Sequence, residues 1–312
     1  MSKVAWVFPG QGAQKAGMGK DFYEKFPIAR DIYDQATKQL GFDVPALCFT
    51  GNDKLDLTEY TQVALVTTCI AIARVMESKR LEPDITAGLS LGEYCAIALA
   101  GGMQDEEAIL TVRERGLFMQ NALPAGVGKM AVVLGMDKQK LLEVINPMEG
   151  VTLANENCPG QLVITGYVEA VQNACDALRE AGAKRTIPLQ VSGAFHSPLQ
   201  EKAGEQLYEV LRQIEWQKLK KMYVTNVTGD LVFKNDRICE LLREQVSAPV
   251  LWQKSVETMI LEGVDTFVEI GPGTTLSGCI RKIDRNVQVY HVGSVEDMED
   301  IMRGELLCRQ EK

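Results

Sequence analysis

The sequence predicts an α/β protein in which a mostly parallel sheet is covered by helices on both faces, with a small ferredoxin-like βαββαβ subdomain inserted into it. The short, fully apolar run at residues 4–8 is typical of a strand buried on both sides of a parallel sheet, and residues 85–89 read as another buried strand. Segments with helical periodicity separate these runs. Between residues 129 and 189 the order changes to strand, helix, strand, strand, helix, strand, which is the split βαβ pattern.

The first part of the chain alternates between the two periodicities. Pro9 and Gly10 end the first strand in a turn, and Pro83 ends the second long helix because proline cannot donate to a helical hydrogen bond. The expected elements are a strand at residues 4–8, helices at 21–40 and 60–81, a strand at 85–89, and helices at 91–100 and 105–123.

The inserted segment lies between glycine-containing joints at Gly126, Gly128 and Gly193. We therefore expect a large α/β subdomain, with an α/β-hydrolase-like core, at residues 1–126 and 194–312, and a small subdomain at residues 127–193. The small subdomain should contain strands at 129–134, 151–154, 162–165 and 184–189 and helices at 137–144 and 169–180. The large one should resume with helices at 198–214 and 238–246, strands at 222–225, 266–270 and 287–292, and a helix after residue 273.

Composition excludes several classes of protein. The formal net charge is −9, so the chain lacks the basic excess of a nucleic-acid-binding protein. No stretch approaches the roughly 20 apolar residues of a membrane span, and the N-terminus does not resemble a secretory signal. The eight cysteines form no C-x-x-C pair, which favours reduced thiols over a disulfide framework or a metal site. We expect a cytoplasmic monomer that binds no nucleic acid, membrane or metal.

The strongest chemical signal is the sequence GLSLG at residues 88–92. G-x-S-x-G between a strand and a helix is the nucleophile elbow, in which the glycines allow a sharp turn and the serine hydroxyl projects at the start of the helix. Backbone N–H groups beside such a serine can bind an oxyanion. Ser90 is therefore the predicted nucleophile.

A serine nucleophile needs a base, and the chain has two histidines. His196 lies in a loop beside Gly193, at the return from the small subdomain, whereas His291 lies within an apolar strand. We therefore predict His196 as the base. Because no acidic partner stands out, a backbone carbonyl could orient its imidazole.

Two further features belong to the predicted site. The glycine-rich loop at residues 10–14 follows the first strand and lacks the spacing of a nucleotide-binding motif, so it could instead supply a second oxyanion donor near Ser90. Arg113 and Arg115 lie on the helix after the elbow. An arginine inside an acyl site would bind an anionic acyl group, but the sequence itself does not choose between the two.

Together these motifs resemble one family, the malonyl-CoA:acyl carrier protein transacylases of fatty-acid synthesis, over nearly the whole chain. The residues that carry the resemblance are FPGQGAQ (8–14), GLSLGEY (88–94), RERGLFMQ (113–120), ANENCPGQLVI (154–164), SGAFHSPL (192–199) and EIGPG (269–273). One residue departs from the family pattern: Leu89 stands where a histidine usually precedes the serine.

The resemblance implies roles for individual residues. Ser90 would be the nucleophile and His196 the general base and acid, with its ring steadied by the backbone carbonyl of Gln245. The malonyl carboxylate would bind Arg115, not Arg113. The remaining implied residues are the backbone amides of Gln11 and Leu91, as the oxyanion hole, and Phe195, which would disfavour a branched acyl group.

The implied reaction is transfer of malonyl from malonyl-CoA to the phosphopantetheine thiol of holo-acyl carrier protein through a malonyl-serine, with no cofactor. Three alternatives remain: a polyketide-synthase-type acyltransferase, a serine thioesterase or esterase with the same elbow, and a carrier-docking module without activity. Candidate carrier-binding residues are the basic clusters Lys184 and Arg185; Lys218, Lys220 and Lys221; and Arg281, Lys282 and Arg285.

Overall fold

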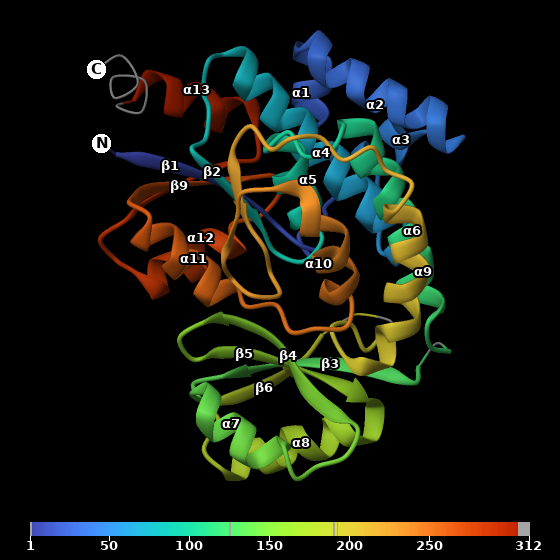
Figure 1. Cartoon of the computed structure of the whole chain (residues 1–312), viewed down its shortest axis with the longest axis vertical. Coiled ribbons are helices and arrows are strands. Elements are labelled where there is room, and N and C mark those ends of the chain that lie inside the picture. The colour runs from blue at the N-terminus through green and yellow to red at the C-terminus, as the bar shows by residue number, and fades with distance from the viewer. Residues whose placement is uncertain (1, 125, 190, 192, 305–312) are drawn as a thin grey trace.

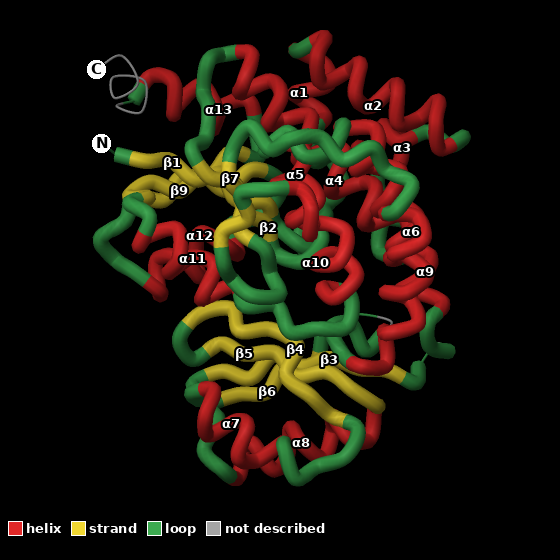
Figure 2. The backbone as a smooth tube through the Cα atoms, in the orientation of Figure 1, coloured by secondary structure: helices red, strands yellow, loops and turns green. Residues whose placement is uncertain are grey.

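The computed structural model describes residues 2–124, 126–189, 191 and 193–304 (Figure 1). It contains a large part, built on a mostly parallel sheet, and a smaller part with an antiparallel sheet below it in the view of Figure 2. The predicted α/β class, with a mostly parallel main sheet, is confirmed.

The large sheet has the strand order β10-β9-β1-β2-β7-β8. Neighbouring strands run parallel from β10 to β7, and β8 runs antiparallel to β7 at the edge. The strands are β1 (Lys3–Phe8), β2 (Ile85–Gly88), β7 (Met222–Val224), β8 (Leu231–Val232), β9 (Val264–Ile270) and β10 (Gln288–Val292).

Both faces of this sheet are buried. Successive side chains of a strand point to opposite faces, and β1 shows this directly. Ala5 and Val7 belong to the hydrophobic cluster under α11 (Trp252–Leu261) and α12 (Thr275–Ile283), whereas Trp6 and Phe8 belong to the cluster shared with other helices. The helices of this second cluster include α4 (Thr58–Ser78), α5 (Gly92–Leu99), α6 (Asp105–Asn121), α9 (Glu201–Leu211) and α10 (Ile238–Gln245).

The antiparallel sheet has the order β4-β5-β3-β6. Its outer face packs against two helices (Figure 1), and its inner face contributes Met130 and Val163 to the cluster of the large part. The elements are β3 (Gly128–Leu134), α7 (Lys138–Ile145), β4 (Val151–Cys158), β5 (Gln161–Tyr167), α8 (Val168–Glu180) and β6 (Arg185–Pro188).

Backbone hydrogen bonds join the antiparallel sheet to the large part of the protein. The amide of Val250, after α10, donates to the carbonyl of Ala154 at 2.8 Å, and the amide of Glu156 donates to the carbonyl of Val250 at 2.9 Å. Strand β4 is thereby attached to the segment that follows Gln245.

Several elements differ from the sequence prediction. The helix expected at 21–40 is two helices, because Phe26 takes an extended conformation before Pro27, as residues preceding proline tend to do. The helix expected at 198–214 begins with a 3₁₀ turn, Pro198–Gln200. The elements α1 (Lys20–Lys25) and α2 (Pro27–Leu40) replace the single helix, and α3 (Val44–Phe49), β8, α11 and α13 (Val295–Arg303) were not predicted.

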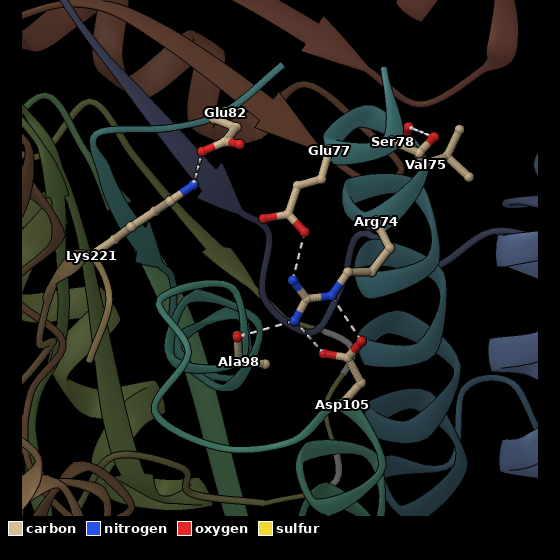
Figure 3. A network of polar contacts seen from close by, with 8 residues as sticks. All are labelled: Arg74, Val75, Glu77, Ser78, Glu82, Ala98, Asp105 and Lys221. Carbon is tan, nitrogen blue, oxygen red and sulfur yellow. Dashed lines mark hydrogen bonds and ion pairs between the residues drawn. The ribbon is translucent and has the colours of Figure 1, made fainter. Parts of the chain in front are cut away.

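A polar network on α4 anchors the helices that follow (Figure 3). The Arg74 guanidinium contacts both carboxylate oxygens of Asp105, at the start of α6, at 2.7 and 2.8 Å, and the carboxylate of Glu77 at 2.6 Å. It also donates to the carbonyl of Ala98, near the end of α5, at 3.2 Å. Arg74 therefore ties together the helix that begins at the elbow and the helix that carries Arg115.

Among the helices of the described residues, none combines the length and apolar character needed to span a bilayer.

Candidate active site

Ser90 lies in a sharp turn between β2 and α5, at the carboxyl end of the central strands. Its φ is +52°, in the left-handed region that residues with side chains rarely adopt. The turn depends on two glycines. A Cβ on Gly88 would lie 2.0 Å from the backbone carbonyl of Gly92, and one on Gly92 would lie 2.2 Å from the carbonyl oxygen of Phe8. The chain approaches itself closely enough here that only glycine fits.

The structure brings Ser90 and His196 together. Ser90 Oγ lies 2.7 Å from His196 Nε2, and His196 Nδ1 lies 2.9 Å from the backbone carbonyl of Gln245. Because a carbonyl oxygen can only accept, Nδ1 carries the ring proton, and Nε2 of the neutral ring is free to accept the proton of the serine.

Burial keeps this imidazole neutral. Desolvation, and next the positive charge of Arg115, lower the pKa of His196 to about 4. At neutral pH the ring is therefore in the unprotonated form that a general base requires.

Arg115 lies in the same site, almost fully buried at 1% exposure. Its guanidinium donates to Ser90 Oγ at 3.2 Å, and to the side-chain oxygens of Gln62 at 2.9 Å and Gln245 at 3.0 Å. The guanidinium carbon also lies 5.6 Å from the centre of the Tyr94 ring, within cation–π range. These contacts are all to neutral groups, and burial lowers the pKa of Arg115.

Arg113 points elsewhere. It forms a 2.5 Å ion pair with Glu59, and its guanidinium lies 4.6 Å from the centre of the Tyr60 ring. The two arginines that the sequence left open occupy different places: Arg115 lines the cavity that contains Ser90, whereas Arg113 is not among its lining residues.

The cavity has a volume of about 260 Å³ and lies between the two sheets. The loop after β1, including Gln11, forms one side, and Leu89 and Phe195 also line it. Leu91 follows Ser90 directly and has a buried side chain, and it is not among the residues that line the cavity. The apolar part of the lining includes Met119, Met130, Val132, Val163, Leu189 and Val191, and the polar part includes Asn155, Asn157, Gln161 and Thr275.

His291 lies outside this cavity. Its Nε2 is 2.8 Å from the backbone carbonyl of Gly271, and it occupies β10 at the sheet edge. Among the described residues, no group of three or more histidine, cysteine, aspartate or glutamate side chains is arranged to hold a metal ion.

Two polar residues of the site were missed by sequence reasoning. Asn226 donates through its side chain to the carbonyl of Gly88 at 2.7 Å and accepts from the amide of Ser90, so it fixes the elbow from the turn after β7. Gln62, on α4, contacts Arg115. A signal for Asn226 existed: it follows a predicted strand, at the edge of the sheet where the elbow also lies.

A serine hydroxyl bonded to a neutral imidazole, on a strand–turn–helix of an α/β fold, defines the class of serine enzymes that handle acyl groups. The family model for the acyl transferase domain matches residues 5–301. The chain is 44% identical over 304 residues to the malonyl CoA-acyl carrier protein transacylase of Bacillus subtilis, covering 96% of each chain.

Solved structures of similar proteins support the same family. The malonyl CoA-acyl carrier protein transacylase of Clostridium perfringens superposes with a TM-score of 0.95 at 39% identity, covering 99% of this chain and 98% of the other. A malonyl-transacylase solved with its type II polyketide acyl carrier protein superposes with a TM-score of 0.92 at 37% identity, covering 97% and 99%. The chain belongs to the malonyl-CoA:acyl carrier protein transacylase family, and the predicted family and acyltransferase class are confirmed.

Proposed function

We propose that this chain transfers a malonyl group from malonyl-CoA to the phosphopantetheine thiol of holo-acyl carrier protein, through a malonyl ester on Ser90, and so supplies fatty-acid chain elongation. One observation carries the proposal: a buried guanidinium, that of Arg115, lies 3.2 Å from the nucleophile's oxygen. In a malonyl group one methylene separates the thioester carbonyl from the carboxylate. A guanidinium beside the nucleophile is therefore suited to bind that carboxylate while the carbonyl is attacked.

In the first half-reaction, Ser90 Oγ attacks the thioester carbonyl while His196 Nε2 takes its proton. The backbone amides of Gln11 and Leu91 bind the oxyanion. The new oxygen–carbon bond forms, the carbon–sulfur bond breaks, and the proton on His196 passes to the sulfur of CoA.

The second half-reaction runs in the opposite sense. The thiol of the carrier's phosphopantetheine gives its proton to His196 and attacks the malonyl ester. The new carbon–sulfur bond forms, and Ser90 leaves with the proton returned to Oγ. In both halves the carbonyl of Gln245 holds the imidazole, and all of this chemistry is supplied by side chains and backbone, without a cofactor.

Selection against other acyl groups rests on the same cavity. Phe195 is 5% exposed and lines it, so a branch beside the α-carbon would meet an aromatic ring. A hydrolase with the same elbow would have no use for a buried arginine at this point.

For the fold, we propose that the two parts act as subdomains at 1–126 with 194–312 and at 127–193, the second of ferredoxin-like type and the first with an α/β-hydrolase-like core. The strand order β4-β5-β3-β6 and the placement of α7 and α8 on one face of this sheet support the ferredoxin-like assignment of residues 127–193. We also propose a cytoplasmic monomer. Of the three basic clusters, the one at 281–285 is favoured for carrier binding, since Lys282 contacts Gln161 on the cavity rim at 3.4 Å.

Intact-mass spectrometry after brief mixing with malonyl-CoA tests the function. The wild type should gain a malonyl-sized adduct that holo-acyl carrier protein removes, and Ser90→Ala should gain none. Ser78→Ala is a matched control, since the Ser78 hydroxyl donates to the carbonyl of Val75 within α4 and Ser78 does not line the cavity. An adduct lost to water as fast as to the carrier would support a thioesterase, and absence of an adduct would overturn the proposal.

A further inference from the structure

Glu93 is a buried carboxylate that is connected to Arg115 and His196 through hydrogen bonds of Gln245. It lies in the first turn of α5, three residues after the nucleophile, and is 0% exposed. Its Oε2 accepts hydrogen bonds from Gln245 Nε2 at 2.7 Å and from the backbone amide of Asn226 at 3.1 Å. Its Oε1 is buried without a hydrogen-bond partner among the described residues.

Gln245 connects this carboxylate to the site. The side-chain nitrogen of Gln245 donates to Glu93 and to the carbonyl of Ser90, at 2.9 Å, while its side-chain oxygen accepts from Arg115 at 3.0 Å. Its backbone carbonyl accepts from His196. Because one donor of the amide faces Glu93, its oxygen must face Arg115, so the carboxylate dictates how the amide is turned.

The charges in this region are unbalanced without Glu93. Within the part of the chain that the structure describes, the hydrogen bonds of the Arg115 guanidinium end on neutral oxygens. A buried charge is stable only when it is balanced nearby. Glu93 and Arg115 act on each other electrostatically, each favouring the charged form of the other, with the Gln245 amide between them.

Burial works against the ionised form of Glu93. Desolvation raises the pKa of this carboxyl to about 7, against the opposing effects of its hydrogen bonds from Gln245 and Asn226 and of the charge on Arg115. The other ionisable groups facing it are Tyr94, on the same helix, and Tyr223, on β7, both buried with pKa values raised by desolvation and hence neutral. The carboxyl therefore changes its charge within the range in which the enzyme would work.

We propose that Glu93 is a positioning residue. Through Gln245 it orients the Arg115 guanidinium and the His196 imidazole, and it is the resident counter-charge of Arg115 until the carboxylate of the substrate arrives. This inference rests on the proposed function, because it concerns how the same site receives an anionic acyl group.

The roles of Glu93 as counter-charge and as positioning residue predict different effects of its loss on substrate binding and on turnover. Without the negative charge, Arg115 is a stronger anion receptor, so the KM for malonyl-CoA should not rise. The Gln245 amide loses its fixed orientation, and with it the placement of the groups that it contacts, so kcat should fall about tenfold. A purely structural role would lower the amount of folded protein and leave kcat, KM and the pH profile per folded enzyme unchanged.

The test compares Glu93→Gln with the wild type in steady-state malonyl transfer to holo-acyl carrier protein between pH 5.5 and 8.5. The matched control is Glu269→Gln, since Glu269 is also 0% exposed but accepts from the amides of Leu276 and Ser277 at the start of α12. We expect wild type and Glu269→Gln to show an ionisation near neutral pH in kcat, and Glu93→Gln to lack it. Glu93→Asp, which keeps the charge, should retain the ionisation even if its kcat is lowered.

Overturning results are equally definite. Either an unchanged kcat and pH profile in Glu93→Gln, or the same loss of the ionisation in Glu269→Gln, would refute the inference. If Glu93→Gln does not fold, loss of the ionisation in folded Glu93→Asp refutes it and retention supports it. Malonylation of wild-type Ser90, measured in parallel, separates the two levels: its absence refutes the proposed function, whereas its presence with unaltered Glu93 variants refutes only the role of Glu93.

Discussion

Replacement of Arg115 by alanine should slow malonyl transfer far more than acetyl transfer. Arg115 is 1% exposed, so its interaction with a substrate carboxylate would be little screened by solvent. Removing one partner of a buried, hydrogen-bonded charge pair costs roughly 3–5 kcal/mol. At about 1.4 kcal/mol per tenfold change in rate, malonyl transfer should fall by about a thousandfold.

Acetyl transfer provides the internal comparison. An acetyl group has no carboxylate for the guanidinium, so its transfer should change by less than about tenfold, within the effect of altered packing. The assay measures initial rates of acylation of holo-acyl carrier protein from malonyl-CoA and from acetyl-CoA, and the quantity compared is the ratio of the two kcat/KM values.

Arg113→Ala is the matched control, because Arg113 lies on the same helix but pairs with Glu59 outside the cavity lining. Its ratio should remain that of the wild type. A parallel loss of both acyl transfers in Arg115→Ala, or an equal loss of selectivity in Arg113→Ala, would refute the assignment of Arg115 to the carboxylate.

Three further predictions concern stability and are checked by denaturant unfolding. The pKa of His196, about 4, lies below its ordinary value of 6.5, so the unfolded chain binds more protons than the folded one between these pH values. The contribution of His196 to the free energy of unfolding therefore falls as the pH drops from 6.5 to 4. Over this range His196→Ala should lose less stability than the wild type. Gly88→Ala should destabilise the protein by about 3 kcal/mol or more, because its Cβ would lie 2.0 Å from the backbone of Gly92. Gly278→Ala, with open space around a helical position, should stabilise the protein by about 0.5–1 kcal/mol. Equal effects of the two substitutions would contradict the close packing of the elbow. Arg74→Met should cost about 1–3 kcal/mol by leaving Asp105 and the Ala98 carbonyl without the guanidinium, and an unchanged midpoint would show that this network does not hold α5 and α6.

Features that depend on neighbouring residues in the chain were predictable. The elbow at Ser90 is a local turn whose glycines and flanking apolar run are contiguous, so its position could be derived from the sequence. The preference for His196 over His291 followed from loop against strand surroundings, and the structure places His196 beside Ser90. The main error of this local kind was at Pro27, where helical periodicity continues across a proline that divides the helix.

Features that depend on the meeting of distant segments were not predictable. Gln62 lies on α4, Glu93 on α5 and Asn226 in the turn after β7, and each is an ordinary polar residue in its own segment. The choice of Arg115 over Arg113 needed either a family resemblance or the direction in which each side chain leaves α6. Helix α11 was missed although Trp252 and Val256 are fully buried, because a short apolar segment does not distinguish helix from strand by itself.

The attachment of β4 to Val250 has a consequence for how acyl preference can diversify. The two bonds at this point are made by backbone amides and carbonyls, which every residue except proline can supply in full. The side chains of the antiparallel sheet that face the cavity, such as Met130 and Val163, can therefore be exchanged, by recombination between relatives or by grafting in the laboratory, while this joint keeps the sheet aligned with the segment that holds His196. The side chains that contact the acyl group can in this way vary independently of the residues that transfer it.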